Sequence, residues 1–191
     1  LYDHLFTLFD FENKYFEKHN LKTTCIGHPI FYIRKENNNV ITKDFIAFLP
    51  GSRSGEIKSL FKFYNYAYET LYKINPNSKI FIPTLPHLYK DIILMTQDWN
   101  LETVITTNKI ESEKLFIKCK QALVCSGTAS IEIAKRGIPQ LVIYKLNYLT
   151  EFIASFFVKV KFANIINILE NKMIINEITN SKLKKDIFIS F

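Results

Sequence analysis

Hydrophobic residues along this chain gather in short apolar runs separated by amphipathic stretches, the pattern of alternating strands and helices. The clearest case is the apolar run 45–49, which a turn at 50–55 separates from a stretch at 56–74 with helical periodicity. Other expected strands fall at 1–9, 23–26, 79–82, 103–106, 122–125 and 140–144. The other expected helices fall at 11–18, 87–99, 110–118 and 129–136. This alternation predicts an α/β fold, a Rossmann-like parallel sheet with helices on both faces.

The two ends of the chain differ from this regular middle part. The chain opens at Leu1 inside a strand-like stretch, so we expect it to be cut from a longer polypeptide. Residues 1–169 are expected to form one domain, because a chain of this size buries roughly 70% of its unfolded surface in a single core. Residues 170–191 have weak periodicity and are expected to be a divergent or truncated tail.

Composition narrows the classes of partner. The net charge of +7 comes mostly from lysine in a chain also rich in Asn, Ile, Phe and Tyr. One explanation is an A/T-rich coding sequence, whose encoded lysines are simply solvated. The other is affinity for a phosphate-bearing surface. No Lys/Arg run, Arg-Gly repeat or helix-turn-helix pattern is present, so no nucleic acid is expected.

Cysteine spacing and hydropathy argue against a zinc or redox site and against a membrane-spanning protein. Cys25, Cys119 and Cys125 form no CxxC pair and have no zinc-like spacing. We interpret them as reduced thiols of a cytoplasmic protein and expect no metal or other cofactor. No uncharged apolar stretch of about 18 residues is present, so no membrane span is expected.

The turn after the strand 45–49 has the composition of an anion site. Gly51 lets a ligand approach the backbone, Ser52 offers a hydroxyl, and Arg53 supplies a fixed cation with paired donors. The helix that follows adds free amide groups and the positive end of its dipole.

The turn after the strand 122–125 repeats this arrangement. It contains Ser126, Gly127 and Thr128, and Glu132 lies four residues after Thr128 on about the same helix face. A phosphate site with a carboxylate one turn away for sugar hydroxyls fits a nucleotide diphosphate. Ligands of parallel sheets bind beyond the carboxyl ends of the strands, where both turns lie.

Plainer interpretations stay open at this level. Gly-Ser turns before helices are ordinary N-caps, and a lone helical glutamate such as Glu132 is often only solvated. His28, in the segment Gly27-His28-Pro29, can be a hydrogen-bonded loop histidine. No catalytic triad, metal cluster or carboxylate pair stands out, so the residues alone indicate a nucleotide-binding α/β domain.

The same segments resemble a known family. They are Ile26-Gly27-His28-Pro29, Leu49-Pro50-Gly51-Ser52-Arg53-Ser54-Gly55-Glu56-Ile57, Ser126-Gly127-Thr128-Ala129-Ser130-Ile131-Glu132 and Asn164-Ile165-Ile166-Asn167-Ile168-Leu169. In order and separation they are similar to the C-terminal, nucleotide-sugar-binding half of lipid-A-disaccharide synthase, an inverting glycosyltransferase of the GT-B fold. The resemblance covers about residues 1–177.

The resemblance implies a metal-free hexosyl transfer in bacterial lipid A biosynthesis. UDP-2,3-diacylglucosamine would donate its sugar to 2,3-diacylglucosamine 1-phosphate, giving the β-1,6-linked disaccharide phosphate and UDP. The family's positions fall on Arg53 beside the phosphates, Glu132 at the ribose and Asn167 near the nucleotide. Gly51, Ser52, Ser126, Gly127 and Thr128 would complete the cradle for the diphosphate.

Two departures from the family matter. The N-terminal domain with the expected general base is absent, so this chain would be inactive without a separate N-terminal half. The tail lacks the family's closing helices, and Asn176 stands where proline is usual.

Further expectations concern cellular location, oligomeric state and alternative functions. The segment 150–162 would face the inner membrane of a cytoplasmic, peripheral enzyme, or form a buried amphipathic helix. A homodimer is a further expectation from the family. The alternatives are a non-catalytic remnant that binds UDP and another GT-B-type UDP-sugar enzyme, such as an epimerase.

Overall fold

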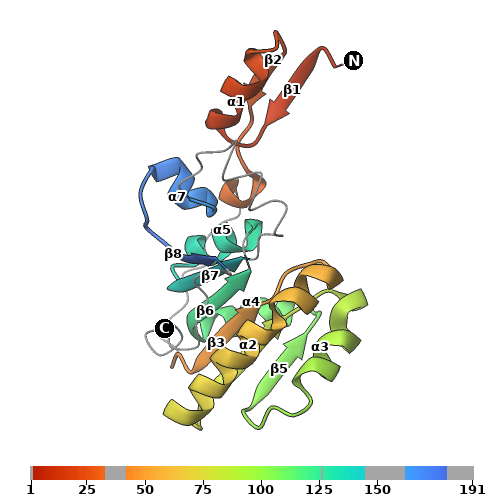
Figure 1. Cartoon of the computed structure of the whole chain (residues 1–191), viewed down its shortest axis with the longest axis vertical. Coiled ribbons are helices and arrows are strands. Elements are labelled where there is room, and N and C mark those ends of the chain that lie inside the picture. Colours follow the sequence, from red (N-terminus) through yellow and green to blue (C-terminus); the bar gives the residue numbers. More distant parts are fainter. Residues whose placement is uncertain (1, 33–41, 126, 145–161, 180–191) are drawn as a thin grey trace. The chain divides into compact units, whose positions relative to one another are not determined.

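The computed structural model describes residues 2–32, 42–125, 127–144 and 162–179 of the chain (Figure 1). Within it the chain divides into two compact units, residues 1–37 and residues 38–191. Each unit has its own sheet.

The first unit is a single β-α-β motif. Strand β1 (His4–Thr7) and strand β2 (Lys22–Cys25) pair in parallel, and helix α1 (Asp10–Glu17) connects them. A short 3-10 helix, η1 (Pro29–Tyr32), follows. The carboxylate of Glu12 accepts a hydrogen bond of 2.9 Å from the amide of Phe9, which fixes the start of α1.

The second unit is built on a six-stranded parallel sheet. Its order is β5-β4-β3-β6-β7-β8, and each neighbouring pair is parallel. The strands are β3 (Phe45–Leu49), β4 (Lys79–Pro83), β5 (Thr103–Thr106), β6 (Cys119–Cys125), β7 (Gln140–Tyr144) and β8 (Asn176–Thr179). Beginning at β3, the chain adds two strands on one side, then returns to place β6 on the other. This is the strand order of the Rossmann fold.

Helices cover both faces of this sheet (Figure 1). They are α2 (Ser54–Ile74), α3 (Tyr89–Thr96), α4 (Lys109–Ile117), α5 (Thr128–Lys135) and α7 (Ile165–Glu170), with the 3-10 turn η2 (Pro86–Leu88) before α3. The sheet has one hydrophobic core on each face, and successive residues of β3 point alternately into one core and then the other. Ile46 and Phe48 face α2 and α3, whereas Phe45, Ala47 and Leu49 pack on the side of α4 and α5. All five residues are buried, as expected for a central strand of a parallel sheet.

The long helix α2 is held to its core by an aromatic cluster. Tyr68 stacks on Trp99 with ring centroids 4.6 Å apart, and Phe48 meets Trp99 edge to face. The indole Nε1 donates to Asn65 Oδ1 at 3.0 Å, so the buried polar edge of Trp99 has a partner. This cluster joins α2 to the loop before β5 and fixes the orientation of the helix.

The structure confirms the predicted α/β class with its parallel sheet and helices on both faces. It also differs from the sequence analysis in detail. The expected helix 87–99 is η2 followed by the shorter α3, and β8 lies in the stretch expected to be a tail. The predicted domain boundary after residue 169 stays a prediction, while the described residues divide into units at 37/38 and the sheet continues beyond 169 in β8. The segment 150–162, apart from Phe162, lies outside the described residues.

Candidate nucleotide-diphosphate site

The predicted turns lie side by side at the point where the strand order reverses. Strands β3 and β6 are parallel neighbours, with Leu49 opposite Val124, so their carboxyl ends open at the same edge. Ligands of doubly wound sheets bind in the crevice outside such a switch point. The two glycine turns follow directly from the ends of these two strands.

The first turn depends on the conformation of Gly51. Its φ is +109°, a backbone conformation that side chains with a Cβ rarely adopt. A Cβ there would stand 2.8 Å from Glu56 Oε2 and 3.5 Å from Cys125 Sγ. Ser52 and Arg53 follow on the surface. The turn therefore presents a close-approach backbone, a hydroxyl and a guanidinium to solvent.

The second turn uses Gly127 in a similar way. Its φ of +147° and ψ of −161° belong to a region essentially restricted to glycine. A Cβ on Gly127 would meet nothing within 4 Å, so backbone conformation, not space, requires the glycine. Thr128 opens α5 and is exposed. Ser126, the remaining predicted residue of this turn, lies outside the described residues.

Both turns lead into helices whose N-caps provide no side-chain hydrogen bond. The N-cap of α2 is Arg53, whose side chain accepts no hydrogen bond from the first amides, and the N-cap of α5 is Gly127, which has no side chain. By contrast, the side chain of Asn108 accepts from two amides at the start of α4, and Asn164 caps α7. An uncapped helix N-terminus keeps amide donors available for an anion.

The Glu56 side chain packs against the first turn beside Gly51, a contact that the sequence did not predict. The Cys125 thiol donates a hydrogen bond to the Glu56 carboxylate, and burial, aided by that carboxylate, raises the pKa of Cys125. Tyr64 is fully buried and donates to the carbonyl of Leu49 at 2.8 Å. Burial is the main cause that raises the pKa of Tyr64, and nearby Cys125 and Glu56 add to it. The sequence contained one indication of a role for Glu56, its position in the first turn of α2 directly after the glycine turn.

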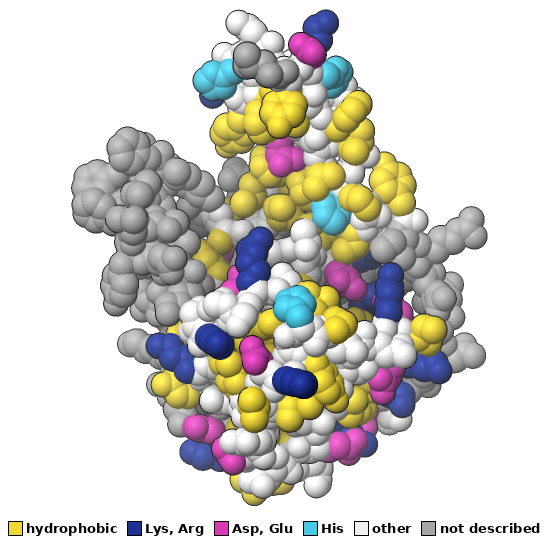
Figure 2. All heavy atoms as spheres, turned by 90° about the vertical axis from the view of Figure 1, so that its right-hand side faces the viewer, with side chains coloured by type: hydrophobic (Ala, Val, Ile, Leu, Met, Phe, Trp, Pro, Cys, Tyr) yellow, Lys and Arg dark blue, Asp and Glu magenta, His cyan; other side chains and the backbone are white. Residues whose placement is uncertain are grey.

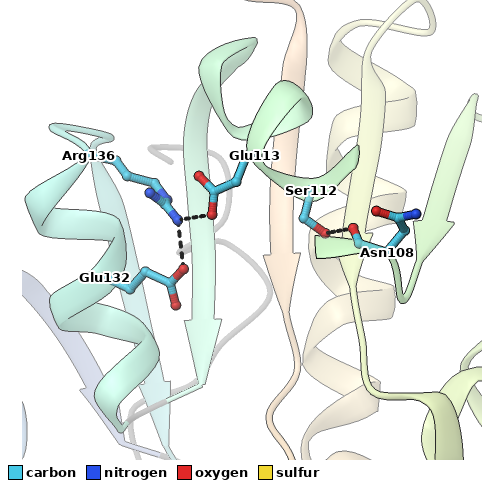
Figure 3. Close-up of polar contacts among 5 residues, drawn as sticks. All are labelled: Asn108, Ser112, Glu113, Glu132 and Arg136. Atoms are coloured by element: carbon cyan, nitrogen blue, oxygen red, sulfur yellow. Dashed lines mark hydrogen bonds and ion pairs between the residues drawn. The ribbon is translucent and has the colours of Figure 1, made fainter. Parts of the chain in front are cut away.

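Glu132 lies one turn inside α5 and half-buried, where it is part of an ionic cluster (Figure 3). Its Oε1 accepts from the guanidinium of Arg136 at 2.8 Å, and Arg136 also binds Glu113 on α4 at 2.7 Å. The Arg136 guanidinium stacks 4.7 Å above the Phe116 ring. The second oxygen of Glu132 has no hydrogen bond among the described residues, so one acceptor is available to a ligand.

Asn167 is fully buried and makes three hydrogen bonds to backbone. Its Nδ2 donates to the carbonyl of Ile175, and its Oδ1 accepts from the amides of Ile174 and Ile175. The side chain thus connects α7 to the segment leading into β8. Its predicted place near the nucleotide stays a prediction.

His28 lies in the first unit. Its Nδ1 accepts from the amide of Ile30 at 3.2 Å, and its ring stacks on Phe9 at 5.7 Å. These contacts are those of a loop histidine with local partners, the plainer interpretation that the sequence left open.

The described residues also bear on metal binding, membrane spanning and disulfide pairing. The described residues contain no group of three His, Cys, Asp or Glu side chains able to hold a metal ion. None of the described helices is long and apolar enough to cross a bilayer. Cys25, Cys119 and Cys125 form no disulfide, and the latter two are buried.

The parallel strand order with helices on both faces defines the fold class, that of the Rossmann-like half of a GT-B glycosyltransferase. The structure of TarM, a GT-B glycosyltransferase, matches 99% of this chain with a TM-score of 0.58 at 14% identity, and the match covers 36% of TarM. The chain belongs to the lipid-A-disaccharide synthetase family, whose model matches residues 1–188.

Individual relatives agree with this assignment. The chain is 34% identical over 188 residues to the lipid-A-disaccharide synthase of Rickettsia canadensis and 33% over 186 residues to that of Rickettsia typhi. In each case the match covers 93% of this chain and 48% or 49% of the relative. The enzyme of Rhodospirillum centenum is 24% identical over 194 residues, which are 96% of this chain and 48% of the relative. The chain thus spans about half the length of the curated relatives it matches.

Proposed function

We propose that this chain binds the UDP-sugar donor of a lipid-A-disaccharide synthase and provides the donor half of that enzyme. The observation that carries the proposal is the pair of uncapped helix N-termini at the switch between β3 and β6. Each follows a glycine with positive φ, so backbone amides can approach a diphosphate closely. Family membership supports UDP-2,3-diacylglucosamine as the donor.

Each site residue has a separate task in this proposal. Gly51 and Gly127 bring the backbone close to the diphosphate, with the hydroxyls of Ser52, Ser126 and Thr128 as further donors. The guanidinium of Arg53 neutralises phosphate charge, which makes its hydrogen bonds stronger than neutral ones. Glu132 accepts hydrogen bonds from the ribose hydroxyls through its second oxygen, while Arg136 fixes its orientation.

The reaction requires a second polypeptide region. The 6-hydroxyl of 2,3-diacylglucosamine 1-phosphate attacks the anomeric carbon of the donor, the bond to the diphosphate breaks, and UDP leaves. A general base takes the hydroxyl proton, and we place that base in the part of the relatives that this chain does not match. We propose a cytoplasmic, peripheral enzyme at the inner membrane because both sugars carry acyl chains, and a homodimer as its assembly.

The second candidate function is a UDP-binding remnant without turnover. A different UDP-sugar enzyme of the same fold is the remaining alternative, and family membership speaks against it.

Isothermal titration of the full chain with UDP tests the site. We expect measurable wild-type binding and a loss of at least several-fold in Arg53→Ala and in Glu132→Ala. A hydrogen bond to a charged group contributes about 1.5–3 kcal/mol. Unchanged affinity in both variants would refute the site.

Two matched controls separate ligand contacts from side effects. Glu113→Ala removes the other carboxylate bound to Arg136 and should leave UDP affinity unchanged. Lys58→Ala removes an exposed cation one turn further along α2, and it too should have no effect. If Glu113→Ala weakens UDP binding as much as Glu132→Ala, the effect comes from the ionic cluster and not from ribose contact.

A further inference from the structure

The guanidinium of Arg53 is the cation at the N-cap of α2, where the proposed site begins. On the face drawn in Figure 2, the described Lys and Arg side chains are dispersed among Asp and Glu side chains, so that face offers no single basic patch to a phosphate. Arg53 is exposed, and none of the described residues forms an ion pair with it. A carboxylate that paired with this guanidinium would compete directly with a phosphate.

Glu56 is the carboxylate whose position in the helix would allow such a pair. It is the third residue of α2, three positions after the N-cap Arg53. Side chains at these two positions are neighbours, and an acid there commonly turns back to accept from the N-cap amide. Helix α1 of the same chain shows this arrangement, because Glu12 holds the same position and accepts from the amides of Leu8 and Phe9, each at 2.9 Å.

The Glu56 side chain takes a different direction, and α2 lacks the capping box that α1 has. Its Oε2 lies under the first turn, 2.8 Å from the position that a Cβ on Gly51 would take, and Cys125 Sγ lies 3.5 Å from the same position. The Cys125 thiol donates a hydrogen bond to this carboxylate. Burial raises the pKa of the thiol, so it keeps the donated proton at neutral pH.

We propose that Cys125 is a positioning residue, whose thiol holds the Glu56 carboxylate under the first turn and so leaves Arg53 and the first amides of α2 open to a diphosphate. This role rests on the proposed function, because the groups left open are those assigned to the donor's phosphates. Without the thiol, Glu56 turns to the helix N-terminus as Glu12 does in α1. There its charge neutralises the guanidinium and repels an anion.

NMR titration of the full, ¹⁵N-labelled chain with UDP and with uridine tests this role. We expect Cys125→Ala to weaken UDP binding by about two- to fivefold, the effect of one competing charge at a helix N-terminus. Uridine has no phosphate, so its affinity should be the same in the wild type and the variant. Cys125→Val, which fills the space of the thiol without a donor, should lose UDP affinity to a similar extent.

Two further variants separate positioning from packing. Cys125→Ser keeps a donor for the carboxylate and should bind UDP as the wild type does. The double variant Cys125→Ala/Glu56→Gln lacks the competing charge and should recover most of the lost affinity. A residue that acted only by filling space would be rescued by neither change.

The matched control is Cys119→Ala. Cys119 is also a buried thiol on β6, but it lies at the opposite end of the strand and donates to the carbonyl of Leu115 at 3.3 Å. This variant should leave the affinities for UDP and uridine unchanged. The dispersion of the amide resonances shows for every variant whether the chain is folded.

Several outcomes would overturn the role of Cys125. They are wild-type UDP affinity in Cys125→Ala and Cys125→Val, a loss that Glu56→Gln does not relieve, and an equal loss of uridine binding. Failure of the wild type to bind UDP would instead refute the proposed function. The Arg53 Nε–Hε resonance of the unliganded chain still tests the positioning in that case, since it should shift in Cys125→Ala and stay in place in Cys125→Ser.

Discussion

At the residue scale, Gly51 is the position where backbone and side chains constrain each other most tightly. Its positive φ turns the chain from β3 towards α2, and the Glu56 carboxylate fills the space where a Cβ would lie. Glu56 in turn accepts the hydrogen bond of Cys125 on β6. The shape of the first turn is therefore held by a neighbouring strand as well as by its own sequence.

Replacement of this glycine should be costly. We expect Gly51→Ala to lower the free energy of unfolding by about 1–3 kcal/mol, because alanine is strained at this φ and its Cβ would collide with Glu56. Gly55→Ala is the matched control, since a Cβ there meets nothing within 4 Å and Gly55 lies in helix α2. It should stabilise by about 0.4–1 kcal/mol. Urea unfolding measures both, and equal effects of the two variants would contradict this account.

Buried acids should make the fold sensitive to alkali. Burial raises the pKa of Cys119 from its ordinary 9.0 to about 12, and burial likewise raises the pKa values of Tyr64 and Cys125. The unfolded chain loses these protons first, so their contribution is complete below about pH 9 and disappears as pH rises towards 12.

Urea unfolding at several pH values checks this dependence. The free energy of unfolding of the wild type should fall as pH rises above 9, the ordinary pKa of the thiol. Cys119→Ala should fall less steeply, although it is less stable at pH 8 because it leaves a small cavity. An identical slope in the two proteins would show that the thiol does not ionise in the unfolded chain as assumed.

At the element scale, the sheet extends beyond the segment that carries the site motifs. Strand β8 pairs with β7, and the Glu177 carboxylate of β8 accepts hydrogen bonds from the amides of Ala163 and Asn164, at 3.0 Å and 2.5 Å at closest. Asn164 also donates to Ser130 on α5. The end of the described chain thus supports the helix that begins at the second glycine turn.

Glu177→Ala tests this support. We expect a loss of about 1.5–3 kcal/mol in the free energy of unfolding, because two backbone amides lose a charged acceptor. Glu170→Ala removes an exposed carboxylate at the end of α7 and should change stability by less than about 0.5 kcal/mol. Thermal unfolding of both variants provides the measurement, and a wild-type melting temperature for Glu177→Ala would exclude the supporting role.

At the scale of the whole molecule, the two units differ in the size of their sheets and of their hydrophobic cores. The second unit has two cores, one on each face of six strands. The first has two strands and one helix. All described residues of the proposed nucleotide site lie in the second unit, whereas the proposed transfer also needs an acceptor site and a general base.

Disaccharide synthesis tests this division. The chain alone should give no β-1,6-linked disaccharide from UDP-2,3-diacylglucosamine and 2,3-diacylglucosamine 1-phosphate, because we place the general base in the part of the relatives that this chain does not match. Addition of the unmatched segment of the Rickettsia typhi enzyme should produce turnover that Arg53→Ala lowers. Thin-layer chromatography of labelled product measures both, and robust synthesis by the chain alone would refute the need for a second half.

The sequence by itself determined the alternation of strands and helices, and with it the parallel α/β fold. Apolar runs such as 45–49 are local signals, because a strand buried on both faces must be apolar at every position. Gly51 and Gly127 were also predictable as turn residues from their place after such runs. Tertiary structure decided the strand order, which makes β3 and β6 neighbours and brings the two turns to one edge.

Other features depended on contacts between distant segments. The pairing of Glu132 with Arg136 and Glu113, the hydrogen bond between Glu56 and Cys125, and the burial of Asn167 follow from packing that no local pattern encodes. Strand β8 has only four residues and weak alternation, so its neighbour β7 determines its structure.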